Sequence, residues 1–136
     1  MFGWLFYALL TLVLWGLWGV FSKIASSHLP VCVIYLVEVS VYLLVGGLIW
    51  VQMRVPFDWN YPGLTAAVAA GLSGGFALFF FLKALSFGPA TVIVPLTSLY
   101  PVITVLLGIT FLHEGLTLRQ LVGIILAVAA VWLLSK

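Results

Sequence analysis

Five long apolar runs make up most of this chain and decide what it can fold into. Each is close to the roughly 17–25 residues that a helix needs to cross a bilayer. Only 6% of the 136 residues are charged, whereas soluble proteins average roughly 25%. We therefore predict an all-α membrane protein with five transmembrane helices, at about residues 3–22, 31–52, 63–82, 90–112 and 119–135.

The connections between the runs are short and leave no residues for a soluble domain. They read SKIASSHLP (22–30), QMRVPFDWNYPG (52–63), LSFGP (85–89) and LHEGLT (112–117), with Pro and Gly marking turns. The sequence has no nucleotide-binding loop of the G-x-x-x-x-G-K type. We therefore expect a single transmembrane domain over residues 1–136, with neither ATP hydrolysis nor nucleic-acid binding.

Positive charges are almost balanced between the two sides of the predicted bundle. With five spans, Arg54 and Arg119 lie on the side of the N-terminus, and Lys23, Lys83 and Lys136 lie on the other. A clear Lys and Arg excess on one side normally fixes orientation, so two against three predicts a chain that inserts both ways. The alternative is a single topology dominated by Arg54.

The chain has no internal repeat, although many secondary transporters need two inverted halves around a site at the membrane midplane. A second copy of opposite orientation supplies the missing half. Such a homodimer has its two-fold axis in the membrane plane and forms an inverted repeat of ten helices.

The C-terminal half carries a set of short motifs that resembles the end of an EamA-type domain of the drug/metabolite transporter superfamily. The resemblance extends over essentially the whole chain, because one such domain has about this length and five helices. The matching residues are Trp15-Gly16, Pro95-Leu96, Tyr100-Pro101-Val102, and the E-x-x-T-x-x-Q-x-x-G segment of Glu114, Thr117, Gln120 and Gly123.

This resemblance implies a multi-pass exporter of small organic molecules in the inner membrane of a bacterium or archaeon. Members of the superfamily generally fuse two units around a central cavity, whereas this chain corresponds to one unit. It is similar in this respect to the related small multidrug resistance proteins, which adopt a dual topology. A different half-size chain is the alternative partner.

One carboxylate interrupts the second run, within YLVEVSVY at residues 35–42. A charged side chain near the bilayer centre costs between about 3 and 10 kcal/mol, so Glu38 needs a polar environment. Tyr35, Glu38 and Tyr42 share one helix face at spacings of three and four. We expect this face to line the bundle interior or a water-filled cavity.

The first run carries a comparable stripe at helical spacing, aromatic in its middle and polar at both ends. Together the two stripes predict a cavity with aromatic walls and one acidic group. A carboxyl group in a low-dielectric site binds a proton readily, so Glu38 is a candidate for proton coupling; the alternative is a neutral or ion-paired Glu38, with Lys23 or Lys83 as partner. The stripe consists of Thr11, Trp15, Trp18 and Ser22.

Pro95 and Pro101 interrupt the fourth run and free backbone carbonyls about one turn earlier. Transporters use such broken helices to build substrate sites. Thr97, Ser98 and Tyr100 are therefore candidate cavity-lining residues.

The last run begins with a predicted capping box, in which Thr117 is the N-cap and Gln120 follows three residues later. Small residues at 123, 127 and 130 form a strip that permits close helix contact, and we place part of the dimer contact there. The third run has a similar strip, formed by Ala66, Ala67, Ala70, Gly71, Gly74 and Gly75.

These patterns predict a secondary transporter that moves small organic metabolites or drugs by alternating access, as a homodimer that is favoured to be antiparallel. The rival interpretation is a non-transporting membrane subunit that stabilises or regulates a partner. An intramembrane enzyme is the weakest interpretation, because the sequence shows no paired carboxylates, Ser/His pair or metal-ligand cluster. We expect no cofactor and no metal, with membrane lipid and a small-molecule substrate as the other partners.

Overall fold

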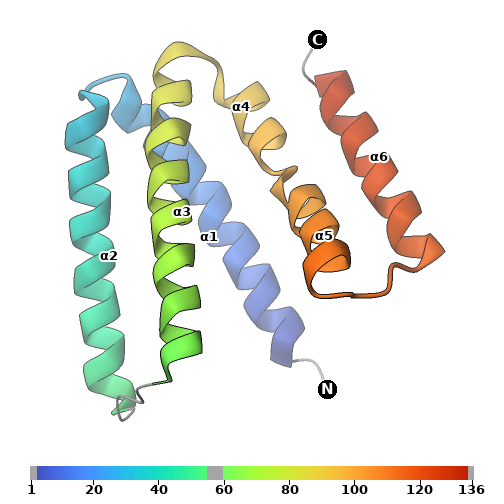
Figure 1. Cartoon of the computed structure of the whole chain (residues 1–136). Helices are drawn as coiled ribbons and strands as arrows, with labels where there is room; N and C mark the ends of the chain where they lie inside the picture. The colour runs from blue at the N-terminus through green and yellow to red at the C-terminus, as the bar shows by residue number, and fades with distance from the viewer. Residues whose placement is uncertain (1–2, 55–59, 135–136) are drawn as a thin grey trace. The chain divides into compact units, whose positions relative to one another are not determined.

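The structure, a computed structural model, describes residues 3–54 and 60–134, and the regular secondary structure in this part of the chain is entirely helical (Figure 1). The prediction of an all-α membrane protein is confirmed: four of the described helical segments are long and apolar enough to cross a membrane. These are Trp4–Ser26, Val31–Met53, Tyr61–Phe87 and Ala90–Phe111, and the apolar helix Leu118–Leu134 is shorter.

The observed helices begin within two residues of the expected runs, but the first and third helices continue four and five residues beyond the expected ends, and the fourth run forms two helices. The chain divides into two units, residues 1–87 and 88–136. The first unit contains α1 (Gly3–Ser26), α2 (Val31–Met53) and α3 (Tyr61–Phe87); the second contains α4 (Ala90–Thr97), α5 (Tyr100–Phe111) and α6 (Leu118–Leu134).

In the first unit, α1, α2 and α3 pack against one another in all three pairings (Figure 1). The buried side chains of this unit are Ser22, Ile34, Leu82 and Leu85. They lie near the end of α1, the start of α2 and the end of α3, so the tightest packing is at one end of the unit. The functional site described below lies at the same end.

The end of α3 is tied to α1 by polar contacts. The Lys23 ammonium donates to the backbone carbonyl of Leu85 at 2.7 Å, and the Ser26 hydroxyl lies 3.5 Å from the same oxygen. Carbonyls in the last turn of a helix lack intrahelical partners and carry partial negative charge. Lys23 therefore stabilises the end of α3 through a contact within its own unit.

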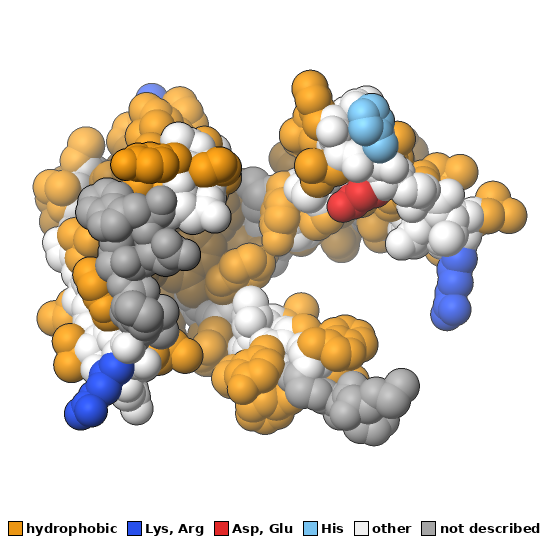
Figure 2. Space-filling view, turned by 60° about the horizontal axis from the view of Figure 1, so that its bottom comes forward, with side chains coloured by type: hydrophobic (Ala, Val, Ile, Leu, Met, Phe, Trp, Pro, Cys, Tyr) orange, Lys and Arg blue, Asp and Glu red, His pale blue; other side chains and the backbone are white. Residues whose placement is uncertain are grey.

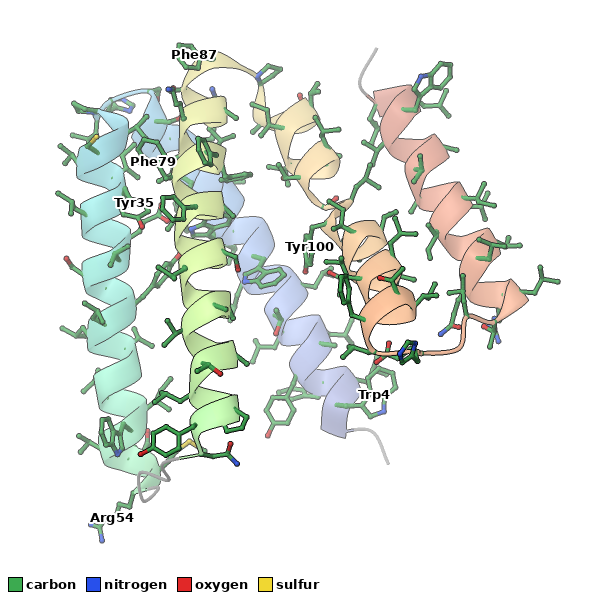
Figure 3. All side chains as sticks on the ribbon, in the orientation of Figure 1. Trp4, Tyr35, Arg54, Phe79, Phe87 and Tyr100 are labelled. Atoms are coloured by element: carbon green, nitrogen blue, oxygen red, sulfur yellow. The ribbon has the colours of Figure 1, made fainter. Side chains whose placement is uncertain are left out.

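Short polar contacts also fix the two ends of the α2–α3 connection. Arg54 follows α2 in the left-handed conformation, at φ 49°, and its N–H donates to the Trp50 carbonyl at 3.0 Å, which is a common helix ending. Asn60 accepts a hydrogen bond from the N–H of Gly63 at 3.0 Å in the first turn of α3. Figure 3 shows Arg54 at the end of α2, with its side chain directed away from the helices.

In the second unit, the predicted fourth run is broken at Ser98 and Leu99, between the two prolines. Pro95 lies inside α4 and Pro101 lies in the first turn of α5, where each removes a backbone donor. The Ser98 hydroxyl donates to the Pro95 carbonyl at 2.7 Å, and the Thr97 hydroxyl donates to the Ile93 carbonyl at 2.8 Å. The break is therefore accommodated by hydroxyl groups of its own residues.

The start of α6 has the capping box that the sequence predicts. The backbone N–H and the hydroxyl of Thr117 both donate to the Gln120 side-chain oxygen, at 2.9 and 2.7 Å. The Gln120 N–H approaches the Thr117 hydroxyl oxygen at 3.4 Å. α6 then packs against α4.

Hydrophobic side chains cover most of the visible surface in Figure 2. Large apolar residues along the helices are widely exposed, for example Leu43 at 74% and Trp4 at 73%. Apolar faces of this extent are a liability in water but are the normal surface of helices in lipid. The exposed surface agrees with a multi-pass membrane protein.

Candidate functional site

Three side chains that the structure describes donate hydrogen bonds to the carboxylate of Glu38. The Trp18 indole N–H donates to Oε2 at 3.0 Å, and the Ser22 hydroxyl donates to Oε1 at 3.0 Å. The Tyr42 hydroxyl lies 3.4 Å from Oε2. The carboxylate is therefore held by neutral donors that contact both of its oxygens.

Helical spacing explains how these groups meet. Trp18 and Ser22 are four residues apart on α1, and Tyr42 follows Glu38 by four residues on α2, so each pair lies on one helix face. Ser22 is only 2% exposed, and its hydroxyl is satisfied through Glu38, as a buried polar group requires. The site thus fixes α1 against α2 through polar contacts.

The third helix joins the site through an aromatic contact. The ring of Trp18 stacks on Phe81 of α3, with centroids 4.9 Å apart and ring planes 22° apart. Aromatic pairs of this kind restrain ring orientation. The indole N–H that reaches Glu38 is therefore positioned by α3 as well as by α1.

A cavity of about 440 Å³ lies beside this network, between α1 and α2. The polar atoms that it presents come from Trp18, Ser22 and Glu38, and the rest of its described lining is apolar. The apolar lining residues are Leu14, Leu17, Phe21, Ala25, Leu29, Ile34 and Val37.

Other residues of the two predicted stripes lie elsewhere in the first unit. The Tyr35 hydroxyl approaches Gly75 of α3, where an added Cβ would lie 3.2 Å away, and its ring meets Phe79 edge-on at 6.0 Å (Figure 3). Trp15 is 60% exposed, and the Thr11 hydroxyl donates to the Tyr7 carbonyl in the preceding turn of α1. The structure therefore brings Trp18, Ser22 and Tyr42 to Glu38. Thr11, Trp15 and Tyr35 lie outside this network.

Sequence reasoning missed the contribution of α3 to this site. Phe81 orients Trp18, and Gly75 leaves room for Tyr35. The stretch FALFFF at residues 76–81 is uniformly apolar and falls within the third predicted run, and Gly75 is one of several small residues there. Neither carries a signal within α3, because each partner is at least 40 residues away along the chain.

The second unit has its own cavity of about 330 Å³, between the helix break and α6. Ser98 lines it, whereas Thr97 and Tyr100 are not among its lining residues. Tyr100, labelled in Figure 3, is exposed. Gly123 and Ala127 also line this cavity, so part of the small-residue strip on α6 faces its own unit. The role of these residues in transport stays a prediction.

Glu114 is the acidic residue of this second cavity. Its carboxylate lies over buried Gly108, where an added Cβ would be 3.0 Å from Oε2. Glu114 is exposed, and its backbone N–H donates to the Gly108 carbonyl at 3.2 Å. These contacts agree with a loop-shaping role for Glu114 at the end of α5.

Apolar helices of spanning length that enclose a carboxylate and its neutral donors define a multi-pass membrane protein with an intramembrane polar site. The chain belongs to the EamA-like transporter family, whose model matches residues 2–136. It is therefore a membrane transporter of the drug/metabolite transporter superfamily, as the resemblance implied.

Two relatives agree with this assignment. The uncharacterised protein MJ1333.1 of Methanocaldococcus jannaschii is 32% identical over 127 residues, covering 93% of this chain and 92% of that protein. The uncharacterised transporter YvbV of Bacillus subtilis is 30% identical over 134 residues, covering 94% of this chain but 43% of YvbV. The chain thus spans less than half the length of the second relative. No solved structure matches the chain.

Proposed function

We propose that this chain is a secondary transporter that exports small organic metabolites or drugs by alternating access, with a proton exchanged at Glu38. The family assignment supports transport, and the carboxylate within the span Val31–Met53 supports the coupling site. The observation that carries the proposal is that neutral donors on two helices meet one intramembrane carboxylate beside a cavity.

The proposed coupling follows from the two protonation states of this carboxyl group. Ionised Glu38 is stabilised by the Trp18 and Ser22 donors from α1. Protonated Glu38 carries no charge, which lowers its cost in a membrane. Protonation therefore weakens the polar contact between α1 and α2, and a proton and a substrate compete for the same group.

We further propose that two copies assemble as an antiparallel homodimer, which supplies the inverted half that the fold of secondary transporters needs. The nearly balanced Lys and Arg distribution supports insertion in both orientations. Gly71 and Gly74 on α3 have open space where a Cβ would stand, and they offer a second copy a face for close helix packing. A different half-size partner is the alternative.

In this proposal Ser98, Thr97 and Tyr100 line the transport path at the helix break, and Trp15, Tyr35 and Tyr42 contribute to the substrate region around Glu38. Ser98 is supported by its place in the second cavity. Tyr42 is supported by its approach to the Glu38 carboxylate.

The direct test is proton-coupled transport by the purified chain in liposomes that contain a pH-sensitive dye. Solutes from a panel of amines, amino acids and nucleobases are added to acid-interior vesicles, and exchange of a substrate for protons is read as a rise in internal pH. We expect the parent and the Ser40→Ala control to respond, because the Ser40 hydroxyl bonds only to its own helix, at the Leu36 carbonyl. Protein-free liposomes measure the pH rise from neutral amines that cross the bilayer and take up protons inside, and Glu38→Gln is expected to respond no more than they do.

Equal transport by Glu38→Gln and the parent from about pH 6 to about pH 8 would remove the proton step. No movement of any solute by the purified chain favours the second candidate, a non-transporting subunit that stabilises or regulates a partner transporter. This candidate is supported by the length of YvbV, of which the chain covers 43%.

The orientation of the chain is tested separately by labelling single cysteines in intact cells. Cys32 is replaced by Ser, and one cysteine is introduced as Ser27→Cys or, in another variant, as Asn60→Cys. Similar labelling of both sites from outside supports the antiparallel homodimer. Labelling of one site alone contradicts it and directs the search to a partner chain.

A further inference from the structure

We infer that the cavity beside Glu38 binds an amphiphilic monoamine, in which one protonated amino group is attached to an apolar body. This inference rests on the proposed function, because it names the substrate class of the same site. It follows from the charge, the hydrogen-bonding capacity and the shape of the cavity.

The charge of the cavity favours a cation. Glu38 is the acidic residue of the lining, and the described lining contains no Lys, Arg or His. The hydrogens of the Trp18 indole and the Ser22 hydroxyl are both donated to Glu38, so neither is directed at a ligand. A carboxylate or phosphate group would find no donor in this lining, whereas an ammonium group finds an acceptor.

Neither of the nearby lysines, Lys23 and Lys83, lines the cavity beside Glu38. Lys23 follows Ser22 on α1, and its ammonium donates to the Leu85 carbonyl at the end of α3. Lys83 is exposed on α3 and does not line the cavity. Among the described residues, the other titratable group in contact with the carboxylate is Tyr42, through its hydroxyl.

The hydrogen bonds at Glu38 limit the ligand to one N–H contact. A carboxylate has about four acceptor positions, and described donors already use three of them, one on Oε1 and two on Oε2. The remaining position suits a single ammonium N–H and not the paired N–H groups of a guanidinium. It offers no hydrogen bond to a quaternary ammonium, and the Trp18 ring, one face of which is covered by Phe81, has limited room for a cation–π contact.

The walls of the cavity select the rest of the ligand. Leu17, Phe21, Ile34 and Val37 present aliphatic and aromatic surface, which favours an apolar body over a polar one. The volume of about 440 Å³ lies within the range of roughly 300–1,000 Å³ that is usual for small-molecule sites. Glu38 is seven residues beyond the start of α2, about 10 Å along the helix, so the amino group must be drawn into the span with its body.

The test uses four probes that share a phenylethyl body and differ in the head group. They are 2-phenylethylammonium, its N,N,N-trimethyl analogue, 2-phenylethanol and 3-phenylpropionate. Binding to the purified parent chain in detergent at neutral pH is measured by calorimetric titration. Because a hydrogen bond to a charged group is stronger than one to a neutral group, we expect 2-phenylethylammonium to bind at least about tenfold more tightly than each of the others.

Glu38→Gln is expected to lose this preference for the ammonium head, whereas Ser40→Ala, on the same helix, is expected to keep it. If Glu38→Gln does not fold, the four probes on the parent chain decide the matter. Equal or tighter binding of the trimethyl analogue, the alcohol or the carboxylate overturns the inference, and so does the absence of binding by 2-phenylethylammonium.

The failure of this inference can be told apart from the failure of the proposed function. Transport of another solute class in liposomes, without 2-phenylethylammonium binding, overturns the inference and leaves the transporter in place. Selective binding of 2-phenylethylammonium by a chain that moves no solute supports the amine site and contradicts the transport proposal.

Discussion

The polar groups of the two units are satisfied in different ways. In the first unit, Glu38 depends on donors that lie 16 and 20 residues earlier, on another helix. In the second unit, the hydroxyls of Thr97 and Ser98 bond to carbonyls three or four residues earlier in the same segment. The first arrangement exists only while α1 and α2 are packed, whereas the second needs only a local turn.

This difference separates a group that can report on helix movement from groups that stabilise a single helix. Moving α1 away from α2 removes two donors from Glu38, so the carboxylate senses the position of α1. Moving α5 leaves the Thr97 and Ser98 hydrogen bonds intact, because donors and acceptors all lie in α4 or directly after it. We therefore propose that the coupling step lies in the first unit and that the break in the second unit shapes the path.

The largest expected effect is that of Glu38→Gln on transport. The amide keeps the size of the side chain but cannot exchange a proton near neutral pH, so we expect proton-coupled transport to fall about a hundredfold or more. Its dependence on pH should be lost with it, since the competing proton no longer has a site. The pH-sensitive dye in acid-interior liposomes measures both effects, and Ser40→Ala should keep both. A coupled rate that survives in Glu38→Gln would move the coupling step out of this unit.

The next effect compares a hydroxyl from each unit. Ser22→Ala removes a buried donor to a carboxylate on another helix, and hydrogen bonds between membrane helices contribute about 1–2 kcal/mol. Ser98→Ala removes an exposed hydroxyl that bonds within its own segment, so the loss is expected to be below about 0.5 kcal/mol. SDS titration followed by circular dichroism measures both changes in unfolding free energy. Equal losses in the two variants would contradict the contrast between long-range and local satisfaction.

The third prediction concerns the contact between α2 and α3. Gly75→Ala places a Cβ about 3.2 Å from the Tyr35 hydroxyl, and the crowding is expected to cost about 1 kcal/mol. Gly46→Ala on α2 meets open space and should cost less. Tyr35→Phe removes the crowded hydroxyl, so it should recover most of the loss in Gly75→Ala. If the double variant is no more stable than Gly75→Ala in the same titration, Tyr35 is not what the glycine accommodates.

The same contrast explains how much could be predicted from the sequence. Local features were accessible: the break between Pro95 and Pro101 and the capping box of Thr117 and Gln120 depend on residues that are close in the chain. Helical spacing also placed Tyr42 on the face of Glu38 and put Trp18 and Ser22 on one stripe.

The sequence does not predict which helix each face contacts. Periodicity gives the direction of a side chain on its own helix but not the neighbouring helix that it meets. Tyr35 lies on the predicted face of α2, yet it turns to Gly75 and Phe79 of α3. Lys23 is a candidate ion-pair partner of Glu38 from the sequence, and in the structure its ammonium donates to the Leu85 carbonyl. Which of two neighbouring helices receives a side chain is decided by packing, and one sequence carries no direct record of it.

The smallest change in stability is expected at the start of α6, where the polar contacts of the second unit are local. Thr117→Ala removes the hydroxyl that holds the Gln120 side chain over the first turn, and loss of such a cap costs about 1 kcal/mol or less at an exposed helix end. Thr110→Ala is the control, because its hydroxyl bonds only to the preceding turn of α5. The difference in unfolding free energy between the two variants should appear in the SDS titration. Thr117→Ala should leave 2-phenylethylammonium binding unchanged, since the cap lies outside the Glu38 cavity. A change in amine binding with Thr117→Ala would show that the second unit acts on the amine site, and the local interpretation of its polar contacts would then be wrong.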